Sequence, residues 1–350
     1  MSGLLVQENV SLQAHNTLAL PAFSRWFAEV ETERQLQQAL QFRQKKNCAL
    51  LVLGSGSNVV LVDDFVGLSI IVNTQGLVIE KETDESVFLS VAAGENWHNT
   101  VMYCVAQGWN GVENLALIPG SVGAAPIQNI GAYGVELTQC FSYLEAIDIA
   151  TGEKHRLDNR ACEFAYRDSV FKHRLKDKVI ITRVVLQLSK QAKWSLDYPA
   201  LKKSLAAYDT ETLSSAIIAD TVIAIRSSKL PDPSDIPNAG SFFKNPIVST
   251  EFYANIKRQY PNVIAFSQAG KRYKLAAGWL LDNAGWRGKL LDGIAMHKDQ
   301  ALVLTNPNRV DGQALLHFVR KVTDDIQQKY AIELEIEPRV YSHLPDKPPL

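Results

Sequence analysis

Two glycine-rich segments contain the residue types that most directly suggest a ligand site. The longer one reads NLALIPGSVGAAPIQNIGAYGV and has no charged residue between Glu113 and Glu136. Its glycines and prolines prevent a long helix, and its amide side chains make it a poor lipid-facing segment. If it is buried, its backbone N–H groups need acceptors, which a bound dinucleotide would supply. The alternative is a set of tight turns between buried strands. We favour the ligand, because glycine also serves close backbone approach.

The shorter segment, GSGSN at residues 54–58, could cradle a pyrophosphate with successive backbone N–H groups. It is not a Rossmann fingerprint, because Val59 occupies the position of the third glycine and a strand-like run follows in place of a helix. It is not a Walker-A loop, because no Gly-Lys-Ser/Thr tail follows. The two glycine-rich segments together could hold the two ends of an extended cofactor such as FAD.

The composition is that of an ordinary globular protein of two or three domains. The 350 residues are 46% hydrophobic and carry a net charge of −1, which gives no general support for nucleic-acid binding. The N-terminus lacks a secretory pattern and no apolar run is long enough to span a membrane, so we expect a cytoplasmic protein without membrane partners. Four widely separated cysteines and seven histidines without ligand spacing predict reduced thiols and no metal site.

The elements that must position these segments are mostly strands in the first half of the chain. Helices are expected over residues 34–46 and 96–107, and residues 151–152 form the turn of a hairpin. Strands are expected at 49–53, 59–62, 68–73, 77–81, 87–92, 143–149, 154–157 and 178–188. This order lacks the regular alternation of a doubly wound sheet, so it predicts an α+β domain.

The second half begins with a polar stretch at 189–212, which we expect to be a loop or a small insertion. A helix over 213–226 follows, and a domain boundary is expected near 190–230. Further helices are expected near 249–259, 274–283 and 310–330, and strands near 263–266, 300–305 and 332–337. The last helix has apolar residues at a period of about 3.6, which predicts one packed face.

A series of motifs in a fixed order carries a family resemblance. The motifs are GSGSNVV, GVENLALIPGSVGAAPIQNIGAYG, FAYRDSVFK, KLPDP, NAGSFFKNP and KLAAGWLLDNAG. In this order they resemble the UDP-N-acetylenolpyruvoylglucosamine reductases (MurB), flavoenzymes of peptidoglycan precursor synthesis. The resemblance covers about residues 15 to 341, and a tyrosine in the 190–212 insertion resembles the subtype that lays a tyrosine-bearing loop over the substrate.

The resemblance implies an α+β fold with an FAD-binding domain of the vanillyl-alcohol-oxidase/PCMH type and a smaller α/β substrate-binding domain. The implied FAD-binding domain covers residues 1–200, with two subdomains split near residue 70. A connecting helix and linker follow at 201–228, then the substrate-binding domain at 229–340 and a tail at 341–350. The implied reaction is reduction of FAD by NADPH, followed by hydride delivery to an enolpyruvyl UDP-sugar to give UDP-N-acetylmuramate.

This reaction adds negative charge to a group that already bears a carboxylate, so the site must supply positive charge and hydrogen-bond donors. The resemblance gives this role to Arg167, whose guanidinium fork suits a carboxylate. From the residues alone, a strand-edge arginine paired with Asp168 is an equally good interpretation. The catalytic glutamate of the family aligns with Glu337 in LEIEPRV, where it could donate to the developing charge if protonated. Glu335 is the alternative, because the proline of the motif has moved to position 338.

The resemblance assigns the proton donor to Ser241. A serine is a poor acid, so it needs neighbours that lower the cost of its alkoxide, and Lys229, Lys244 and the backbone N–H groups at 238–241 are candidates. Without the motif, Ser241 would be taken for a turn serine or a helix cap, and Glu337 for an exposed glutamate in a terminal strand.

The implied ligand contacts complete the prediction. The residues expected to bind FAD are Gly54, Ser55, Gly56, Ser57, Asn58, Pro119, Gly120, Ser121, Gly123, Ala124, Ala125, Gln128, Asn129, Gly131, Ala132, Tyr133 and Gly134. Those expected to line the substrate site are Tyr166, Tyr198, Lys229, Asn245 and Gln300. The first glycine loop contains no histidine, so we expect the flavin to be bound non-covalently. Two alternatives remain open, an alcohol-oxidising flavoenzyme and a non-catalytic nucleotide-binding module.

Overall fold

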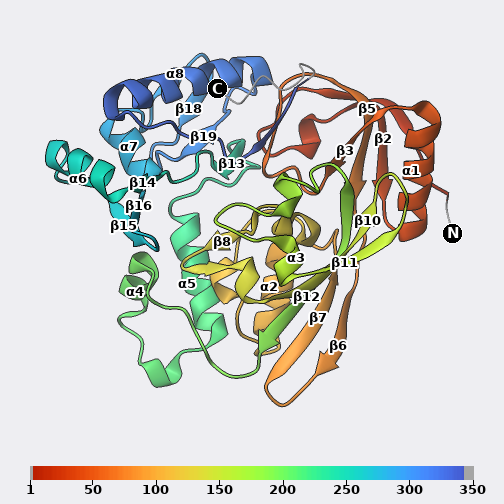
Figure 1. Ribbon diagram of the computed structural model, residues 1–350, viewed down its shortest axis with the longest axis horizontal. Helices are drawn as coiled ribbons and strands as arrows, with labels where there is room; N and C mark the ends of the chain where they lie inside the picture. Colours follow the sequence, from red (N-terminus) through yellow and green to blue (C-terminus); the bar gives the residue numbers. More distant parts are fainter. Residues whose placement is uncertain (1–2, 343–350) are drawn as a thin grey trace. The chain divides into compact units, whose positions relative to one another are not determined.

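The computed structural model describes residues 3–342, which fall into two compact units (Figure 1). The first unit contains residues 24–55 and 66–228 together with the first ten residues, and the second contains 11–23, 56–65 and the chain from 229 onward. Most of the predicted tail, from residue 343 onward, lies outside the described residues. No helix within residues 3–342 is long and apolar enough to cross a membrane.

The second unit includes two short segments that the prediction placed in the FAD-binding domain. Backbone bonds explain this membership: the N–H of Asn238 donates to Thr17 O at 2.9 Å, and Asn306 Nδ2 donates to Leu18 O at 2.9 Å. Similarly, the N–H of Arg339 donates to Asn58 O at 3.0 Å. The division into FAD-binding and substrate-binding ranges remains a prediction about function.

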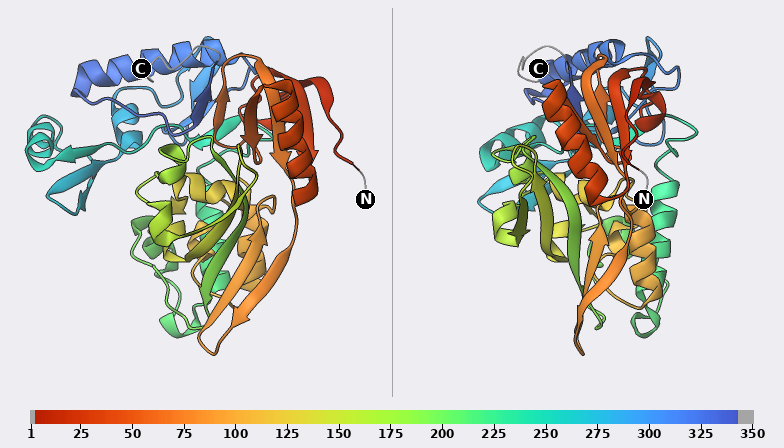
Figure 2. Two further views of the ribbon diagram at one scale, coloured as in Figure 1. Left: turned by 45° about the vertical axis from the view of Figure 1, so that its right-hand side comes forward. Right: turned by 90° about the vertical axis from the view of Figure 1, so that its right-hand side faces the viewer.

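The first unit contains a four-stranded sheet with a helix packed on it. The strand order is β1 (Gln7–Ser11), β2 (Phe23–Val30), β5 (Phe65–Val72) and β3 (Ala49–Leu53). Helix α1 (Glu33–Lys46) is capped by the side chain of Thr32 and ends in basic residues, which suits the helix dipole. Its Leu36, Ala39 and Leu40 share a buried cluster with Trp26 of β2, and Figure 2 shows the helix lying along the sheet. Strand β2 is not among the elements predicted from the sequence.

The larger sheet of the first unit is fully antiparallel, and its strands correspond to the runs predicted at 77–81, 87–92, 143–149, 154–157 and 178–188. Its order is β11 (Lys154–Asp158), β10 (Phe141–Asp148), β12 (Val179–Ser189), β7 (Ser86–Ala92) and β6 (Leu77–Glu82). Helices α2 (Trp97–Ala106) and α5 (Ser215–Ser227) lie side by side next to this sheet (Figure 1). The predicted helix over 96–107 is confirmed, with Asn96 as its N-cap.

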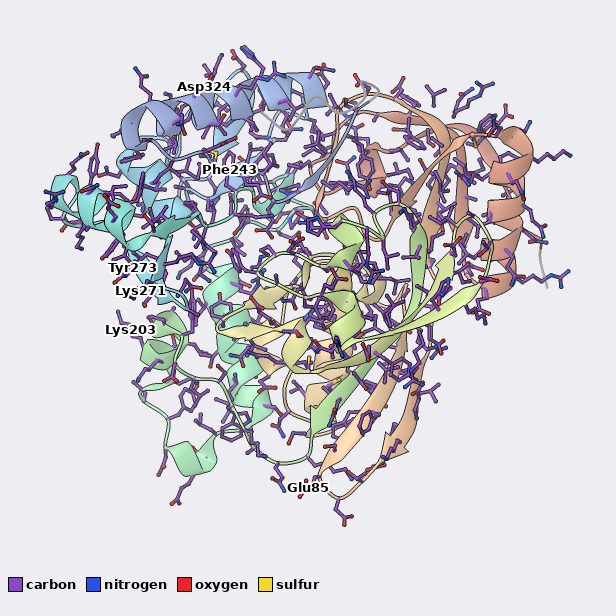
Figure 3. All side chains as sticks on the ribbon, viewed as in Figure 1. Glu85, Lys203, Phe243, Lys271, Tyr273 and Asp324 are labelled. Atoms are coloured by element: carbon purple, nitrogen blue, oxygen red, sulfur yellow. The ribbon has the colours of Figure 1, made fainter. Side chains whose placement is uncertain are left out.

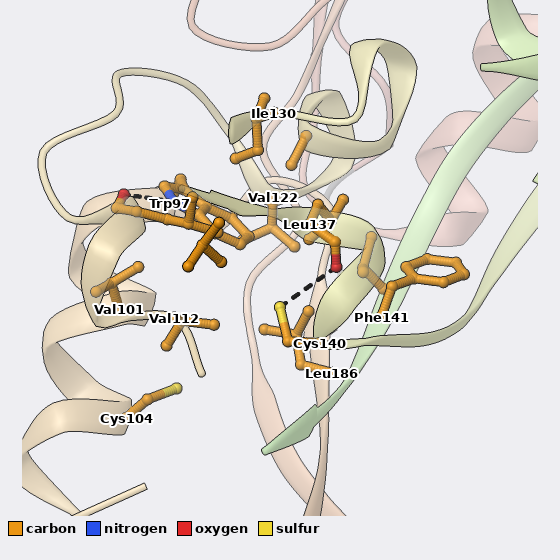
Figure 4. Close-up of a cluster of buried hydrophobic side chains, with 14 of the residues drawn as sticks. Trp97, Val101, Cys104, Val112, Val122, Ile130, Leu137, Cys140, Phe141 and Leu186 are labelled. Atoms are coloured by element: carbon orange, nitrogen blue, oxygen red, sulfur yellow. Dashed lines mark hydrogen bonds between the residues drawn. The ribbon is translucent and has the colours of Figure 1, made fainter. Parts of the chain in front are cut away.

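The core between this sheet and α2 is apolar with a few internal hydrogen bonds. Trp97 is fully buried and its indole Nε1 donates to Leu115 O at 3.0 Å, while the thiol of Cys140 donates to Leu137 O at 3.4 Å (Figure 4). All four cysteines are free thiols, as predicted. Burial raises the pKa of Cys140 to about 12, so this thiol stays protonated and acts as a core residue.

The polar stretch at 189–212 is more ordered than the expected loop. It contains helix α4 (Pro199–Leu205), which has Pro199 at its first position, where a missing N–H costs little. Leu201 and Leu205 of this helix are buried in the main core of the first unit. The sequence signal was weak because only these two apolar residues mark the packed face of a helix of two turns.

The second unit contains small sheets and three helices. The strand order in the largest sheet is β13 (Asn238–Ser241), β19 (Val303–Thr305), β18 (Ile294–Met296) and β17 (Leu290–Leu291), and a second sheet contains β14 (Ile247–Ser249), β16 (Arg272–Leu275) and β15 (Ala265–Gln268). The helices are α6 (Thr250–Gln259), α7 (Ala277–Asn283) and α8 (Gly312–Tyr330). Tyr273 of β16, labelled in Figure 3, stacks on Tyr253 of α6 with ring centroids 4.0 Å apart.

Two sequence-based expectations for the second unit have different outcomes. The apolar face of α8 is confirmed, because Leu315, Phe318 and Val322 are fully buried. The strand expected near 332–337 is wrong, because this stretch has one isolated bridge and the strand lies later, at β20 (Arg339–Tyr341). Strand β20 pairs in parallel with β4 (Val59–Leu61), a non-local partner that the local sequence pattern does not reveal.

Candidate active site

The two glycine-rich segments approach each other within the first unit. A side chain on Gly54 would place its Cβ 2.3 Å from Ser121 Oγ and 3.6 Å from Ala124 Cβ, so any residue other than glycine would force the Ser121 side chain to move. Gly56 belongs to the second unit, has φ of +63°, and would bring a Cβ to 2.0 Å from His15 O. Gly54 therefore packs against the longer segment, whereas Gly56 is required by its own packing, and the prediction that the two segments hold the two ends of one cofactor stays a prediction.

Several amides of the longer segment already have acceptors within the protein. The segment forms a 3-10 helix, Val122–Gln128, and the N–H groups of Val122 and Gly123 donate to Glu95 O and Ala93 O, each at 2.8 Å. A Cβ on Gly123 would lie 2.6 Å from Ala93 Cβ, which explains this glycine by packing. The sequence left two interpretations of this segment open, a ligand site and a set of tight turns. Tight turns account for the amides of Val122 and Gly123, so these two amides are not available to hold a ligand.

Ser121 is placed differently from its neighbours. It forms an isolated antiparallel bridge with Asn96, flanked by the hydrogen bonds Trp97 N–H to Gly120 O and Val122 N–H to Glu95 O. Residues at such a non-hydrogen-bonded position direct their own N–H groups away from the pairing. The Ser121 amide, beside Gly54, is thus oriented to donate outside this backbone pair.

The end of the longer segment is a tight hairpin of β8 (Gly131–Ala132) and β9 (Val135–Glu136). Its two loop residues, Tyr133 and Gly134, have φ of +49° and +87°, as a type I′ turn requires. Left-handed backbone at a tyrosine costs on the order of 1–3 kcal/mol and is concentrated at functional sites. Asn114 holds the strained residue, because its Nδ2 donates to Tyr133 O at 2.9 Å.

Tyr198, predicted to line the substrate site, lies on this hairpin. Tyr198 is 41% exposed, and its ring packs edge-on against the Tyr133 ring, with centroids 5.1 Å apart. A side chain on Gly134 would lie 3.3 Å from Ser195 Oγ, so glycine allows the 190–212 insertion to approach the hairpin. Burial raises the pKa of Tyr133, so its hydroxyl keeps its proton at neutral pH.

Arg167 extends from a two-residue turn towards the same hairpin. Ala165 and Asp168 exchange backbone hydrogen bonds of 3.1 and 3.2 Å, and Arg167 has φ of +54° at the turn position that usually requires glycine. Its Nη2 donates to Gly131 O at 2.7 Å, and its guanidinium lies 5.5 Å from the Tyr166 ring centroid. The Asp168 carboxylate is bonded to the His173 ring at 2.8 and 2.9 Å. The second interpretation, in which Arg167 serves mainly as the partner of Asp168, therefore loses support.

The sequence reasoning missed two residues of the first unit, Arg226, whose charge interacts with that of Arg167, and His98, whose charge interacts with that of Arg226. Arg226 lies in the last turn of α5, where burial and, after it, the charge of Arg167 lower its pKa. His98 of α2 accepts the Leu117 N–H at its Nδ1, 3.1 Å away, and burial and the charge of Arg226 lower its pKa. A signal for Arg226 was present: it is the basic residue that ends the otherwise apolar helix AIIADTVIAIR.

In the second unit, the predicted proton donor and glutamate lie on neighbouring backbone segments. Phe243 and Ile336 form an antiparallel bridge, and the N–H of Glu337 donates to Phe242 O at 2.9 Å. Ser241, at the end of β13, is next to Phe242 in the chain, so it lies one position from Glu337 across this pairing. Both residues are partly buried.

The neighbouring charged residues distinguish the two candidate glutamates. The Glu335 side chain is 66% exposed and forms an ion pair with Lys244. That pair engages the ammonium group that the sequence analysis offered as a neighbour of Ser241. Glu337 is less exposed and is not the partner of Lys244 in this pair. The geometry therefore favours Glu337 over Glu335.

The remaining predicted substrate residues are also in the second unit. Asn245 Oδ1 accepts the Ala277 N–H at the start of α7, 2.9 Å away, which is a structural role. Gln300 Oε1 lies 3.2 Å from the position that a side chain on Gly278 would occupy in the same helix. Lys229 is exposed at the first position after α5 and its C-cap. The predicted residues thus form one group in the first unit, around Tyr133 and Arg167, and a second group in the second unit.

Comparison with known proteins first defines a class. A family model of an FAD-binding domain matches residues 25–158, and a model of the C-terminal domain of UDP-N-acetylenolpyruvoylglucosamine reductase matches residues 232–341. The chain is therefore a flavoprotein in which an FAD-binding domain precedes a separate C-terminal domain. The predicted fold class, α+β with a smaller second domain, is confirmed.

Whole-chain relatives then identify the family. The chain is 42% identical over 330 residues to UDP-N-acetylenolpyruvoylglucosamine reductase of Paraburkholderia phytofirmans, covering 93% of this chain and 95% of that one. It is 41% identical over 335 residues to the reductase of Pseudomonas putida, covering 96% and 98%. The crystal structure of the Thermus caldophilus reductase shares the fold, with a TM-score of 0.68 at 22% identity, covering 97% of this chain and 100% of that one.

The chain belongs to the UDP-N-acetylenolpyruvoylglucosamine reductase (MurB) family, and it is an FAD-dependent oxidoreductase. This result decides against both alternatives that the sequence left open, the alcohol-oxidising enzyme and the non-catalytic nucleotide-binding module.

Proposed function

We propose that this protein uses NADPH to reduce the enolpyruvyl group of UDP-N-acetylglucosamine enolpyruvate, which gives the peptidoglycan precursor UDP-N-acetylmuramate. Non-covalently bound FAD would supply the hydride-transfer chemistry between NADPH and the substrate. The observation that carries the proposal furthest, beyond family membership, is the position of Arg167. Its guanidinium is held at Gly131, in the glycine-rich segment that we expect to bind the flavin.

The residues of the first unit fit an FAD group. Gly54 allows the Ser121 side chain to approach its backbone closely, and the Ser121 amide is oriented out of its own backbone pairing. Tyr133 presents a ring at a strained turn next to Tyr198. The GSGSN loop lacks a histidine, which supports non-covalent attachment.

Arg167 would stabilise the negative charge that develops on the substrate carboxylate. A guanidinium fork can donate two parallel hydrogen bonds to a carboxylate, and these strengthen as charge accumulates there. The bond to Gly131 O and the left-handed turn fix the position of the fork before substrate arrives. Such preorganisation avoids reorientation during the reaction, which is why we assign this residue to the transition state.

Ser241 and Glu337 are the other two residues that we assign to the reaction. Glu337 would donate a hydrogen bond to the developing enolate if it is protonated, and Ser241 would supply the proton that completes the product. Their adjacent backbone segments keep the two side chains in register with each other. Lys229 remains the candidate cation that lowers the cost of the serine alkoxide, because Lys244 is paired with Glu335.

An anaerobic experiment tests the proposal. The purified protein should be yellow, NADPH should bleach the visible flavin band, and the enolpyruvyl UDP-sugar should restore it. UDP-N-acetylglucosamine without the enolpyruvyl group is the matched control and should leave the flavin reduced. A flavin that NADPH does not reduce, or that both sugars reoxidise equally, would contradict the proposed reaction. Acid precipitation should release the flavin into the supernatant, and a yellow pellet would contradict non-covalent binding.

A further inference from the structure

We propose that Arg226 is a further flavin-binding residue, whose buried Nε–H would donate to the isoalloxazine and whose charge would favour the reduced, anionic state over the neutral oxidised state. This inference rests on the proposed function, because it requires bound FAD. It adds a redox-tuning role that neither Arg167 nor the predicted cofactor contacts supply.

The first argument is an unsatisfied donor. In the described part of the chain, Arg226 Nε is buried and has no hydrogen-bond partner. Most buried polar groups in native proteins are paired, so a buried guanidinium N–H without an acceptor indicates that a ligand provides one. Arg226 lies in α5, which packs against α2 and against the short 3-10 helix Glu113–Leu115 at the start of the uncharged segment.

The second argument is charge. Burial lowers the pKa of Arg226, the Arg167 cation acts in the same direction, and Tyr133 acts in the opposite one. An arginine nevertheless remains protonated in proteins, so two guanidinium groups act on each other in the first unit. Their repulsion is relieved when a negative charge arrives, because opposite charges attract strongly where water is excluded.

The remaining neighbours do not supply that negative charge. His98 accepts the Leu117 N–H at Nδ1, so its proton is on Nε2, and its lowered pKa keeps the ring neutral at pH 7. The raised pKa of Tyr133 keeps the phenol protonated. The groups whose charges act on Arg226 are thus the Arg167 cation and the protonated Tyr133 phenol, and the buried carboxyl of Glu113 on the adjacent 3-10 helix forms no hydrogen bond with Nε. We therefore expect the acceptor for Nε on a ligand.

The acceptor for Arg226 Nε could lie on the cofactor or on a substrate, and the time that each stays bound distinguishes the two. NADPH and the UDP-sugar exchange at every turnover, and each departure would leave the buried Nε without an acceptor. A resident cofactor satisfies it continuously. Hydride transfer from NADPH leaves NADP⁺ and adds two electrons and one proton to the isoalloxazine, which then carries one negative charge. A fixed cation stabilises that state more than the neutral one, so Arg226 would raise the reduction potential of the flavin.

The test compares reduction potentials of holoenzymes carrying Arg226→Met, Arg226→Lys and, as a distant control, Arg34→Met on the exposed face of α1. Each protein is equilibrated with a redox dye while flavin absorbance is followed, and its FAD content and melting temperature are recorded. In Arg226→Met, the equilibrium preference for reduced over oxidised flavin should fall roughly tenfold or more. For a two-electron couple, each tenfold loss lowers the reduction potential by about 30 mV. Arg226→Lys and Arg34→Met should stay close to the original protein.

The outcomes separate this inference from the proposed function. If the unmodified protein binds no FAD, the proposed function fails. If it binds FAD but Arg226→Met shows an unchanged potential, only the role of Arg226 is overturned, and a rise confined to the KM for the UDP-sugar would assign Arg226 to the substrate. If Arg226→Met does not fold, the pair Arg226→Lys and Arg226→Gln decides: equal potentials would overturn the charge argument, and a lower potential for the glutamine variant would support it. Loss of folding in all three variants would assign a structural role and overturn the inference.

Discussion

The Nη2 of Arg167 donates to the carbonyl oxygen of Gly131 at 2.7 Å, across 36 positions of sequence. This bond ties the arginine turn at 165–168 to the β8–β9 hairpin, and both turns have non-glycine residues in left-handed backbone. Strain of this kind persists only where the surrounding structure fixes it, and it is typical of functional sites. The relationship gives the chain a guanidinium of fixed position within the unit that contains the FAD-binding family match.

We expect Arg167→Lys to impair the second half-reaction selectively. A lysine keeps the positive charge but loses the fork and its donation to Gly131, so stabilisation of the developing carboxylate charge should weaken. Loss of one such donor typically costs about 10²–10³-fold in rate. Stopped-flow traces should show slower flavin reoxidation by the UDP-sugar with near-normal reduction by NADPH. Arg174→Lys, at an exposed pair with Glu163, is the control, and equal slowing in both variants would remove the assignment.

Ser241→Ala should also separate the two half-reactions. The variant removes the predicted proton donor, and general-acid help is typically worth about 10²–10⁴-fold. Flavin reduction by NADPH should be retained while reoxidation by substrate slows. The matched control is Ser267→Ala on exposed β15, which should behave as the original protein. An unchanged second half-reaction in Ser241→Ala would exclude the serine from proton donation.

The two candidate glutamates can be separated by the same conservative change. Glu337→Gln should lower kcat by about 10²-fold or more, the range for a lost acid or charge-stabilising group. Glu335→Gln should leave kcat nearly unchanged, because the Glu335 side chain is 66% exposed and is engaged by Lys244 in an ion pair. Steady-state assays of the purified variants measure both. The reverse order of effects would show that the shifted proline has moved the catalytic position to Glu335.

Glu113 should make the stability of the protein fall as pH rises. Glu113 is 2% exposed, and this burial raises the pKa of its carboxyl above 4.5. The Gly111 N–H donates to Glu113 Oε2 at 2.6 Å, and this hydrogen bond lowers the pKa by less than burial raises it. Because the folded state favours the protonated carboxyl, its contribution is complete below the unfolded pKa and is lost as pH rises through the folded pKa. Glu113→Gln should therefore gain stability relative to the original protein as pH rises from about 4.5. Urea unfolding at several pH values measures the difference, and a constant difference would refute the linkage.

Local patterns predicted much of this fold because the relevant physics acts over a few residues. The apolar face of α8 follows from helical periodicity, and α2 from its Asn96 cap. Helix α4 was missed because its packed face comprises two leucines, and the strand predicted near 332–337 lies later because its partner, β4, is far away in the chain. Register with a distant strand is set by tertiary pairing, which no local window contains.

The amino-acid sequence by itself determined the family, because motifs spread along the chain occur in one order and together are specific. It also predicted that GSGSN and the uncharged segment hold the two ends of one cofactor, whereas the close approach of Gly54 to Ser121 is visible only in the structure. Only the tertiary structure decided which amides of that segment are already bonded, which glutamate is paired with Lys244, and that the charge of Arg226 interacts with Arg167 and Tyr133. These are questions of which charges and donors are brought together from distant positions, and burial, which gives them their strength, exists only in the folded chain.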